Sequence, residues 1–294
     1  MNGFSPEWLA LREPADHRGR SEEVLAALRR RFAERDEVRV IDLGCGTGSN
    51  LRATAPYLPH RQTWILVDHD PKLLASAREQ LCAWADTADV RNDALRIRKD
   101  GFELAVAFRN ADLAADFENV LTEPFDLVTA AALFDLVSIA WIERFACAVA
   151  RRRAAAYTAL NYNGVEIWTP PHAADADVLA AFNAHQTGDK GFGPSAGPAA
   201  SAALARAFRA LAYEVMTGDS PTPLEEASVI REVVECVVEA ARETGRVPHE
   251  RLADWRAARA TGAACTIGHT DLLAAPRIFK ASARAANLPD RAGA

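Results

Sequence analysis

The sequence predicts an α/β fold in which helices cover both faces of a doubly wound, mostly parallel sheet. Short apolar segments alternate with helical patterns along the chain, and this alternation is typical of parallel strands joined by crossover helices. The strand candidates are apolar almost throughout, as expected for strands that are buried on both faces. A chain of 294 residues, 49% of them hydrophobic, is long enough to bury such a core without disulfides or metals.

The chain begins with a helical segment, predicted over residues 1–36. Ser21 is a favourable N-cap residue, and the two glutamates that follow it place negative charge in the first turn, where the helix dipole favours it. Apolar residues then recur at helical spacing, at Val24, Leu25, Leu28 and Phe32.

Seven strand candidates follow. The first is rich in β-branched residues and is followed by glycines. The candidates are Val38–Leu43, Trp64–Val67, Glu103–Phe108, Phe125–Thr129, Ala156–Asn161, Tyr213–Thr217 and Cys265–Leu273. Helical spacing of apolar residues predicts helices between and after them. The helix candidates are Lys72–Trp84, Val137–Ala150, Asp175–His185, Ala199–Ala210, Pro223–Thr244 and Leu252–Ala260.

The segment over residues 162–198 interrupts this rhythm. It holds two consecutive prolines, one helix candidate and a glycine-rich loop, so we interpret it as an insertion after the fifth strand that lies over the strand ends. No linker-like change of composition divides the rest, and we predict one domain over residues 37–276. Residues 277–294 are predicted to be a C-terminal tail.

Composition argues against several classes of protein. With 40 acidic and 34 basic residues, the net charge of −6 makes nucleic acid an unlikely partner. The five cysteines form no C-x-x-C pair and have no histidine at ligand spacing, so neither a disulfide framework nor a metal site is predicted. The N-terminus lacks the apolar run of a signal peptide, and charges interrupt the most apolar stretch, Phe125–Ala150. We therefore predict a cytoplasmic protein with reduced thiols and no membrane span.

A glycine loop follows the first strand candidate. Gly44, Gly46 and Gly48 lie between a predicted strand and a predicted helix, where glycines permit a tight turn and the close approach of a ligand. In open α/β sheets the ligand crevice lies outside the carboxyl ends of the strands. The loop is therefore placed to bind a nucleotide-like cofactor.

The spacing of the loop narrows the choice of cofactor. The dinucleotide fingerprint G-x-G-x-x-G requires Gly or Ala at position 49, which is Ser49 here. The chain also lacks the phosphate-cradling pattern G-x-x-x-x-G-K-S/T. The loop therefore fits a nucleoside with a small polar tail better than it fits a pyrophosphate.

Two acidic residues follow the next two strand candidates. Asp68 comes 20 residues after Gly48, which is the spacing of a carboxylate that accepts hydrogen bonds from two ribose hydroxyls. Asp112 follows the third strand, where it is suited either to accept from the exocyclic amine of adenine or to cap the next helix. Together with the glycine loop, these acids predict a nucleoside site.

These segments resemble the motifs of the class I S-adenosylmethionine-dependent methyltransferases. Val40–Gly48 (VIDLGCGTG) is similar to the first motif of that family and Leu66–Pro71 (LVDHDP) to the second. Asn110–Leu113 and Phe125–Asp135 resemble the third and fourth, so that the resemblance covers residues 37–160. It implies a seven-stranded sheet with an antiparallel final strand, S-adenosyl-L-methionine as the cofactor, and methyl transfer to a small-molecule acceptor.

The resemblance also implies roles for particular residues. Asp42 and the glycines would hold the methionine part of the cofactor, Asp68 the ribose hydroxyls and Asp112 the adenine amine. Leu113 would pack on the adenine ring, and the segment Ala131–Leu133 would line the methyl-donor end. The candidate cofactor-binding residues are Asp42, Gly44, Cys45, Gly46, Gly48, Asp68, His69 (in place of the family's usual apolar residue), Asp112, Leu113 and Ala131.

Two residues are candidates for catalysis. Methyl transfer from an activated sulfonium requires orientation, and a general base only if the acceptor must lose a proton. His185 in the insertion is a candidate base on a substrate lid; the alternative is a helix C-terminal cation in a solvated loop. Tyr162 is the second candidate.

Other interpretations stay open. A non-catalytic scaffold or sensor that binds S-adenosylmethionine would share these motifs, whereas an NAD-dependent oxidoreductase is disfavoured by Ser49. The valine-rich helix candidate Pro223–Thr244 belongs either to the core or to the interface of a homodimer.

Overall fold

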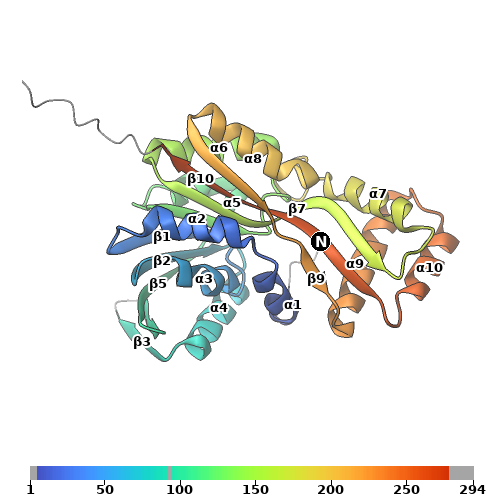
Figure 1. Cartoon of the computed structure of the whole chain (residues 1–294), viewed down its shortest axis with the longest axis horizontal. Coiled ribbons are helices and arrows are strands. Elements are labelled where there is room, and N and C mark those ends of the chain that lie inside the picture. The colour runs from blue at the N-terminus through green and yellow to red at the C-terminus, as the bar shows by residue number, and fades with distance from the viewer. Residues whose placement is uncertain (1–4, 92–93, 278–294) are drawn as a thin grey trace, which may run out of the picture.

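The computed structural model describes residues 5–91 and 94–277, and its centre is one twisted sheet with helices on both faces (Figure 1). The strands of these residues are β1 (Glu37–Leu43), β2 (Arg61–Asp68), β3 (Thr87–Arg91), β4 (Ala94–Lys99), β5 (Phe102–Asn110), β6 (Leu127–Ala131), β7 (Ala155–Thr169), β8 (Tyr213–Asp219), β9 (Thr222–Leu224) and β10 (Ala264–Pro276).

Polar residues begin several of the helices. Asp70 accepts a hydrogen bond from the amide of Lys72 at the start of α4, while Ser21 takes the N-cap position of α2 without a side-chain capping bond. The helices are α1 (Pro6–Arg18), α2 (Glu22–Phe32), α3 (Ser49–Thr54), α4 (Pro71–Trp84), α5 (Leu113–Val120), α6 (Ile139–Arg152), α7 (Asp175–Gln186), α8 (Ala200–Ala210), α9 (Ala227–Thr244) and α10 (His249–Ala258), with 3₁₀ turns at Ala55–Tyr57 and Gly197–Ala199.

The strand order is β3-β4-β5-β2-β1-β6-β7-β10-β8, and β9 pairs with β10. The strands from β5 to β7 are parallel, whereas β10 is antiparallel to both β7 and β8. This confirms the predicted doubly wound, mostly parallel sheet with an antiparallel final strand. The winding reverses between β1 and β6, and sheets of this type bind ligands outside the strand ends at such a point.

Two apolar layers hold the helices on the sheet. Leu28 of α2 and Leu81 of α4 pack on one face around Trp64, whereas Phe117 of α5 and Phe145 of α6 pack on the other. Trp64 and Phe117 are 0% exposed. Because full burial of such a side chain contributes about 1.5–3 kcal/mol, these layers fix the positions of the strand ends.

A third apolar cluster lies where β7 and β10 extend beyond the parallel part of the sheet, at the right of Figure 1. Helices α7, α9 and α10 pack there around Val233, Trp255 and Tyr162. Ala15 of α1 belongs to the same cluster and Trp8 packs against it, so the N-terminal helix contacts this cluster.

A hairpin at the edge of the sheet departs from the expected seven strands. Strands β3 and β4 pair antiparallel with each other, and β4 pairs antiparallel with β5. Leu95 and Ile97 are buried, whereas Arg96 and Arg98 between and after them are exposed. Buried and exposed side chains thus alternate with a period of two residues, which is typical of a strand, although the charged residues make this pattern hard to recognise in the sequence.

The expected boundaries of the insertion and of one helix were wrong. Strand β7 continues to Thr169, so the first residues of the segment 162–198 prolong a strand instead of leaving the sheet. The helix expected over Pro223–Thr244 begins only at Ala227, because residues 222–224 pair with β10 as β9. Apart from Arg277, the predicted tail lies outside the described residues.

No helix in the described part of the chain combines the length and the apolarity that crossing a bilayer requires.

Candidate functional site

The glycine loop joins β1 to α3 at the carboxyl edge of the sheet. Gly44, Gly46 and Gly48 have φ values of 64°, 53° and 77°, a backbone region that residues with a Cβ rarely adopt. The amide of Cys45 donates to the carbonyl oxygen of Val67 at 2.9 Å, which fastens the loop to the end of β2. The three glycines are therefore required by the shape of the turn.

Asp68, the last residue of β2, is joined to the same loop. Its Oδ2 accepts a hydrogen bond from the amide of Gly46 at 2.9 Å, and its Oδ1 accepts one from the amide of Asp70 at 3.0 Å. The residue is 5% exposed. The structure thus brings together the loop and the acid that the sequence places on successive strands.

Asp42 lies in the sheet directly before the loop and is completely buried. Its Oδ1 accepts from Nδ2 of Asn50 at 2.6 Å, but its Oδ2 has no partner among the described residues. Burial raises the pKa of Asp42 to about 7, against the opposing effects of the Asn50 hydrogen bond and the Arg20 charge. Oγ1 of Thr47 is likewise buried without a partner. Unpartnered acceptors beside the loop fit a ligand that brings hydrogen-bond donors, such as an ammonium group.

The other candidates follow neighbouring strands. Asp112 is exposed and caps α5, with its Oδ1 accepting from the amide of Ala114 at 2.8 Å. Leu113 is buried in the apolar layer beneath α5 and α6, and Ala131 ends β6 half-buried. Leu133 reaches the loop, since a Cβ placed on Gly44 would lie 3.4 Å from its Cδ1.

Cys45 and His69 differ in their surroundings. Cys45 is 5% exposed, and burial raises the pKa of its thiol, which keeps the sulfur protonated and a poor nucleophile. The side chain of His69 is 75% exposed, and its Nδ1 lies 3.4 Å from Oδ1 of Asp68.

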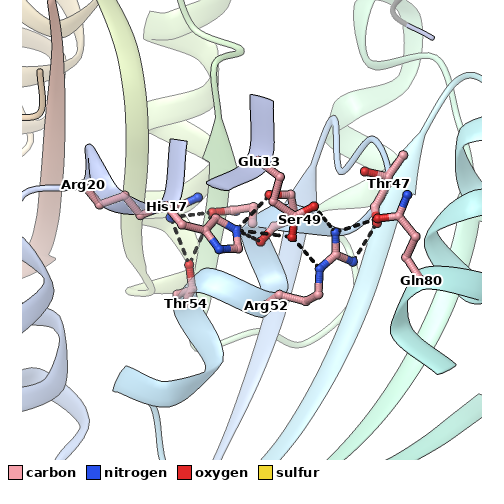
Figure 2. A network of polar contacts seen from close by, with 9 residues as sticks. Glu13, His17, Arg20, Thr47, Ser49, Arg52, Thr54 and Gln80 are labelled. Carbon is pink, nitrogen blue, oxygen red and sulfur yellow. Dashed lines mark hydrogen bonds and ion pairs between the residues drawn. The ribbon is translucent and has the colours of Figure 1, made fainter. Parts of the chain in front are cut away.

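Figure 2 shows that charged and polar side chains fasten α1 to the helix after the glycine loop. The guanidinium of Arg52 donates through Nε to Oε1 of Glu13 at 2.7 Å and through Nη1 to the carbonyl oxygen of Thr47 at 2.9 Å. Leu9 lies over the loop itself, because a Cβ on Gly46 would lie 3.1 Å from its Cδ1. Helix α1 therefore covers part of the candidate cofactor site.

Two further residues of the N-terminal segment reach α3. Nε2 of His17 lies 3.1 Å from the carbonyl oxygen of Ser49 and 2.9 Å from its hydroxyl oxygen. Burial, with the charge of Arg20, lowers the pKa of His17, so the ring is neutral at pH 7. Nη1 of Arg20 donates to Oδ1 of Asn50 at 2.9 Å. Ser49, which departs from the dinucleotide fingerprint, is thus a contact residue for α1.

Replacing Glu13 with Gln is expected to lower the unfolding free energy by about 1–3 kcal/mol, because the Arg52 side chain, 6% exposed, would lose its only charged partner in the network. Chemical denaturation measures this loss. Glu7→Gln is the control, since Glu7 is exposed on the same helix, and it should change stability by less than about 0.5 kcal/mol. Equal losses in the two variants would contradict the role given to Glu13.

The two candidate catalytic residues lie along α7 and β7. Nε2 of His185 lies 2.9 Å from Oε2 of Glu243 on α9, and Nζ of Lys190 lies 3.2 Å from its Nδ1. The hydroxyl of Tyr162 donates to Oδ1 of Asn183 at 2.8 Å, and burial raises the pKa of the phenol. Within the described residues, the contacts of these two side chains include no member of the glycine loop.

Sequence reasoning missed the residues that hold α1 in place. Glu13 and Arg52 belong to no motif, and their pairing joins positions 39 residues apart. Asp135 ends the segment that resembles the fourth motif, but the resemblance gives it no role; the structure shows it 9% exposed, with Oδ1 lacking a partner in the described part of the chain. Over residues 5–91 and 94–277, no three His, Cys, Asp or Glu side chains gather as metal ligands.

The chain is similar to known proteins in sequence and in fold. Residues 41–155 match a family model for a methyltransferase domain. No curated protein matches the sequence. Among solved structures, the chain is similar to the YcgJ protein of Bacillus subtilis (15% identity, TM-score 0.47, 87% of this chain and 99% of that one). It is also similar to the cyclopropane synthase MmaA2 of Mycobacterium tuberculosis (11% identity, TM-score 0.46, 92% and 94%) and to a putative methyltransferase of Bacillus halodurans (12% identity, TM-score 0.45, 86% and 97%).

Proposed function

We propose that this chain, whose residues 41–155 match a family model for a methyltransferase domain, is a class I methyltransferase that transfers the methyl group of S-adenosylmethionine to a small-molecule acceptor. The observation that carries the proposal is the hydrogen bond from Gly46 to Asp68, which joins the glycine loop to the acid at the end of β2. A nucleoside cofactor needs these two features side by side, because the backbone of the loop must be approached closely while the acid accepts from the ribose.

The residues around the loop fit the polar groups of this cofactor. Asp68 would accept from the ribose hydroxyls and Asp112 from the adenine amine. The unpartnered oxygen of Asp42, with the buried hydroxyl of Thr47, would accept from the ammonium of the methionine part. Leu113 would pack on the adenine ring.

When bound, the cofactor supplies a methyl group that its sulfonium already activates for displacement. The chain supplies orientation and shelter from water. Helix α1, held by Glu13 and Arg52, would cover the site and exclude water. Such positioning contributes about 7–11 kcal/mol to rate acceleration in well-oriented reactions.

The acceptor is proposed to be small because of the surroundings of the site and the charge of the chain. The segment from β7 to α8 would narrow the space over the strand ends, and one of its contacts with the loop after β6 is the hydrogen bond from the amide of Gly197 to the carbonyl oxygen of Asp135 at 3.0 Å. A net charge of −6 disfavours a polyanionic acceptor. The free cysteines fit a reducing compartment such as the cytoplasm.

Thermal melting with S-adenosylmethionine, S-adenosylhomocysteine and NAD tests the proposal. Each sulfur nucleoside at 100 times its dissociation constant should add about 2.7 kcal/mol, which corresponds to a rise of about 5–11 °C for a chain of this size. NAD should produce no rise. A rise with NAD alone would overturn the proposal in favour of an oxidoreductase. S-adenosylhomocysteine formation with a panel of phenols, hydroxy acids and amines would then test transfer itself.

A further inference from the structure

Asp135 has a buried carboxyl group, and one of its two oxygens lacks a hydrogen-bond partner among the described residues. It lies four residues after the end of β6 and is 9% exposed, and the oxygen in question is Oδ1. Buried polar atoms are nearly always paired, so each unpaired one calls for a reason. A ligand group that donates a hydrogen bond would satisfy this oxygen.

Asp135 follows closely after the segment Ala131–Leu133, which would line the methyl-donor end of the proposed cofactor site. Leu133, two residues earlier, packs against the glycine loop at Gly44. The backbone amide of Tyr162 on β7 hydrogen-bonds to the carboxyl of Asp135, and the amide of Gly197 donates to its carbonyl oxygen. The carboxyl therefore lies where the loop after β6, the middle of β7 and the segment before α8 meet.

The groups around Asp135 come from three elements. Arg12 of α1 lies close enough for its charge to act on Asp135, and its own Nε is buried without a partner. On β7, the phenol of Tyr162 lies close enough for the charges of Asp135 and Glu166 to act on it, and the ring of His269 on β10 packs against this phenol. Burial raises the pKa of Asp135 to about 6, against the backbone hydrogen bonds and the Arg12 charge, while burial lowers the pKa of His269 to about 3.

We propose that Asp135 hydrogen-bonds to the nucleophile of the acceptor and takes its proton, and that the acceptor reacts through a hydroxyl or amine N–H group. This inference rests on the proposed methyl transfer. The nucleophile's lone pair forms the new bond to the methyl carbon, the electron pair of the broken C–S bond stays on sulfur, and the proton of the nucleophile passes to Oδ1 of Asp135 and then to solvent. No other reactant is needed.

The other acid–base groups of this region are less suited to this role. The ring of His185 contacts Glu243 of α9 and Lys190. Burial raises the pKa of Tyr162, so its phenol keeps its proton near pH 7 and donates a hydrogen bond to Oδ1 of Asn183. Glu166 accepts from Nε1 of Trp168 and lies four residues further out along β7.

Calorimetric binding of S-adenosylmethionine and S-adenosylhomocysteine tests the position of Asp135 without any acceptor. The two ligands differ in the sulfonium charge, so the ratio of their dissociation constants reports a charge near the sulfur. In the wild type, preference for S-adenosylmethionine should rise about three- to tenfold between pH 5 and pH 7.5, as Asp135 ionises. In Asp135→Asn most of this rise should be lost, leaving only the smaller effect of Asp42, whose pKa is about 7, and the carboxamide keeps an oxygen for the amide of Tyr162.

Glu166→Gln is the matched control. It removes a different carboxyl, on β7, which is half-buried and whose pKa is raised to about 7 by desolvation. The pH dependence of the ratio should survive in this variant. A ratio that is flat in the wild type, or that becomes flat only in Glu166→Gln, would overturn the role of Asp135 while leaving cofactor binding intact. Failure of the wild type to bind either ligand would instead overturn the proposed function, and the further inference with it.

Activity gives a second readout with any acceptor that the wild type methylates. Asp135→Asn should lower kcat about 100-fold or more with little change in KM, and the acidic limb of the pH–rate profile near pH 6 should disappear. An unchanged kcat with a retained acidic limb would contradict a proton-accepting role.

Discussion

Asp68→Ala is expected to abolish the thermal stabilisation by S-adenosylmethionine. The carboxylate would make two charge-assisted hydrogen bonds to the ribose, each contributing about 1.5–3 kcal/mol, and their loss weakens binding by roughly 10²- to 10⁴-fold. The substitution also removes the acceptor of the Gly46 and Asp70 amides, which leaves the glycine loop less well held. Isothermal titration and melting with the ligand measure both effects.

Asp70→Ala is the control for this variant. Asp70 lies two residues away and caps α4, so its loss should lower stability by about 1 kcal/mol without changing the affinity for the ligand. A ligand-induced shift that persists at full size in Asp68→Ala would show that the ribose is not held there.

Asp271→Ala should produce the largest loss of stability. Asp271 is 0% exposed on β10, and its carboxylate accepts from the amides of Ser21 and Leu160 at 3.0 and 2.8 Å and from the hydroxyl of Tyr157 at 3.3 Å. Three buried donors would be left unpaired, which costs about 3–5 kcal/mol in total. The melting temperature should fall by roughly 6–20 °C.

Asp219→Ala provides the comparison for Asp271. Asp219 is exposed at the end of the neighbouring strand β8, and its removal should change stability by less than about 0.5 kcal/mol. If Asp271→Ala unfolds within about 1 kcal/mol of the wild type, the buried network does not hold the N-terminal segment on the sheet.

The parts of the fold that the sequence predicted are those with a local signal. The strand before Gly44 and the helix after Asp70 follow from short-range periodicity and from residues that favour turns and caps. The hairpin β3–β4 was not predicted because only two apolar residues, placed among charged ones, show the alternation that is typical of a strand. The extension of β7 escaped because Gly164, in a left-handed conformation, reads as a turn within what is one strand.

The sequence predicts the parts of the candidate site that belong to motifs, but not the parts whose position depends on tertiary contacts. The glycine loop and Asp68 are recognisable from spacing. The contact of Glu13 with Arg52 is not, because neither residue has a local reason to find the other. The chemistry of histidine makes His185 a candidate base, but its position on α7 does not determine which neighbouring element its ring faces. Asn183 hydrogen-bonds to Gly164 on β7, whereas His185 contacts Glu243 on α9.

The hydrogen bond from Ser21 to Asp271 has a consequence for how the protein is made. The two residues are 250 positions apart, and one belongs to the segment that covers the glycine loop while the other belongs to the last strand. During synthesis the N-terminal segment leaves the ribosome first, yet this anchor does not exist until residue 271 has emerged. Domains fold as units and contacts distant in sequence form late. The anchoring of the N-terminal segment to the sheet is therefore completed only after synthesis of the last strand, whereas the contacts of α1 with the glycine loop and α3 do not involve that strand.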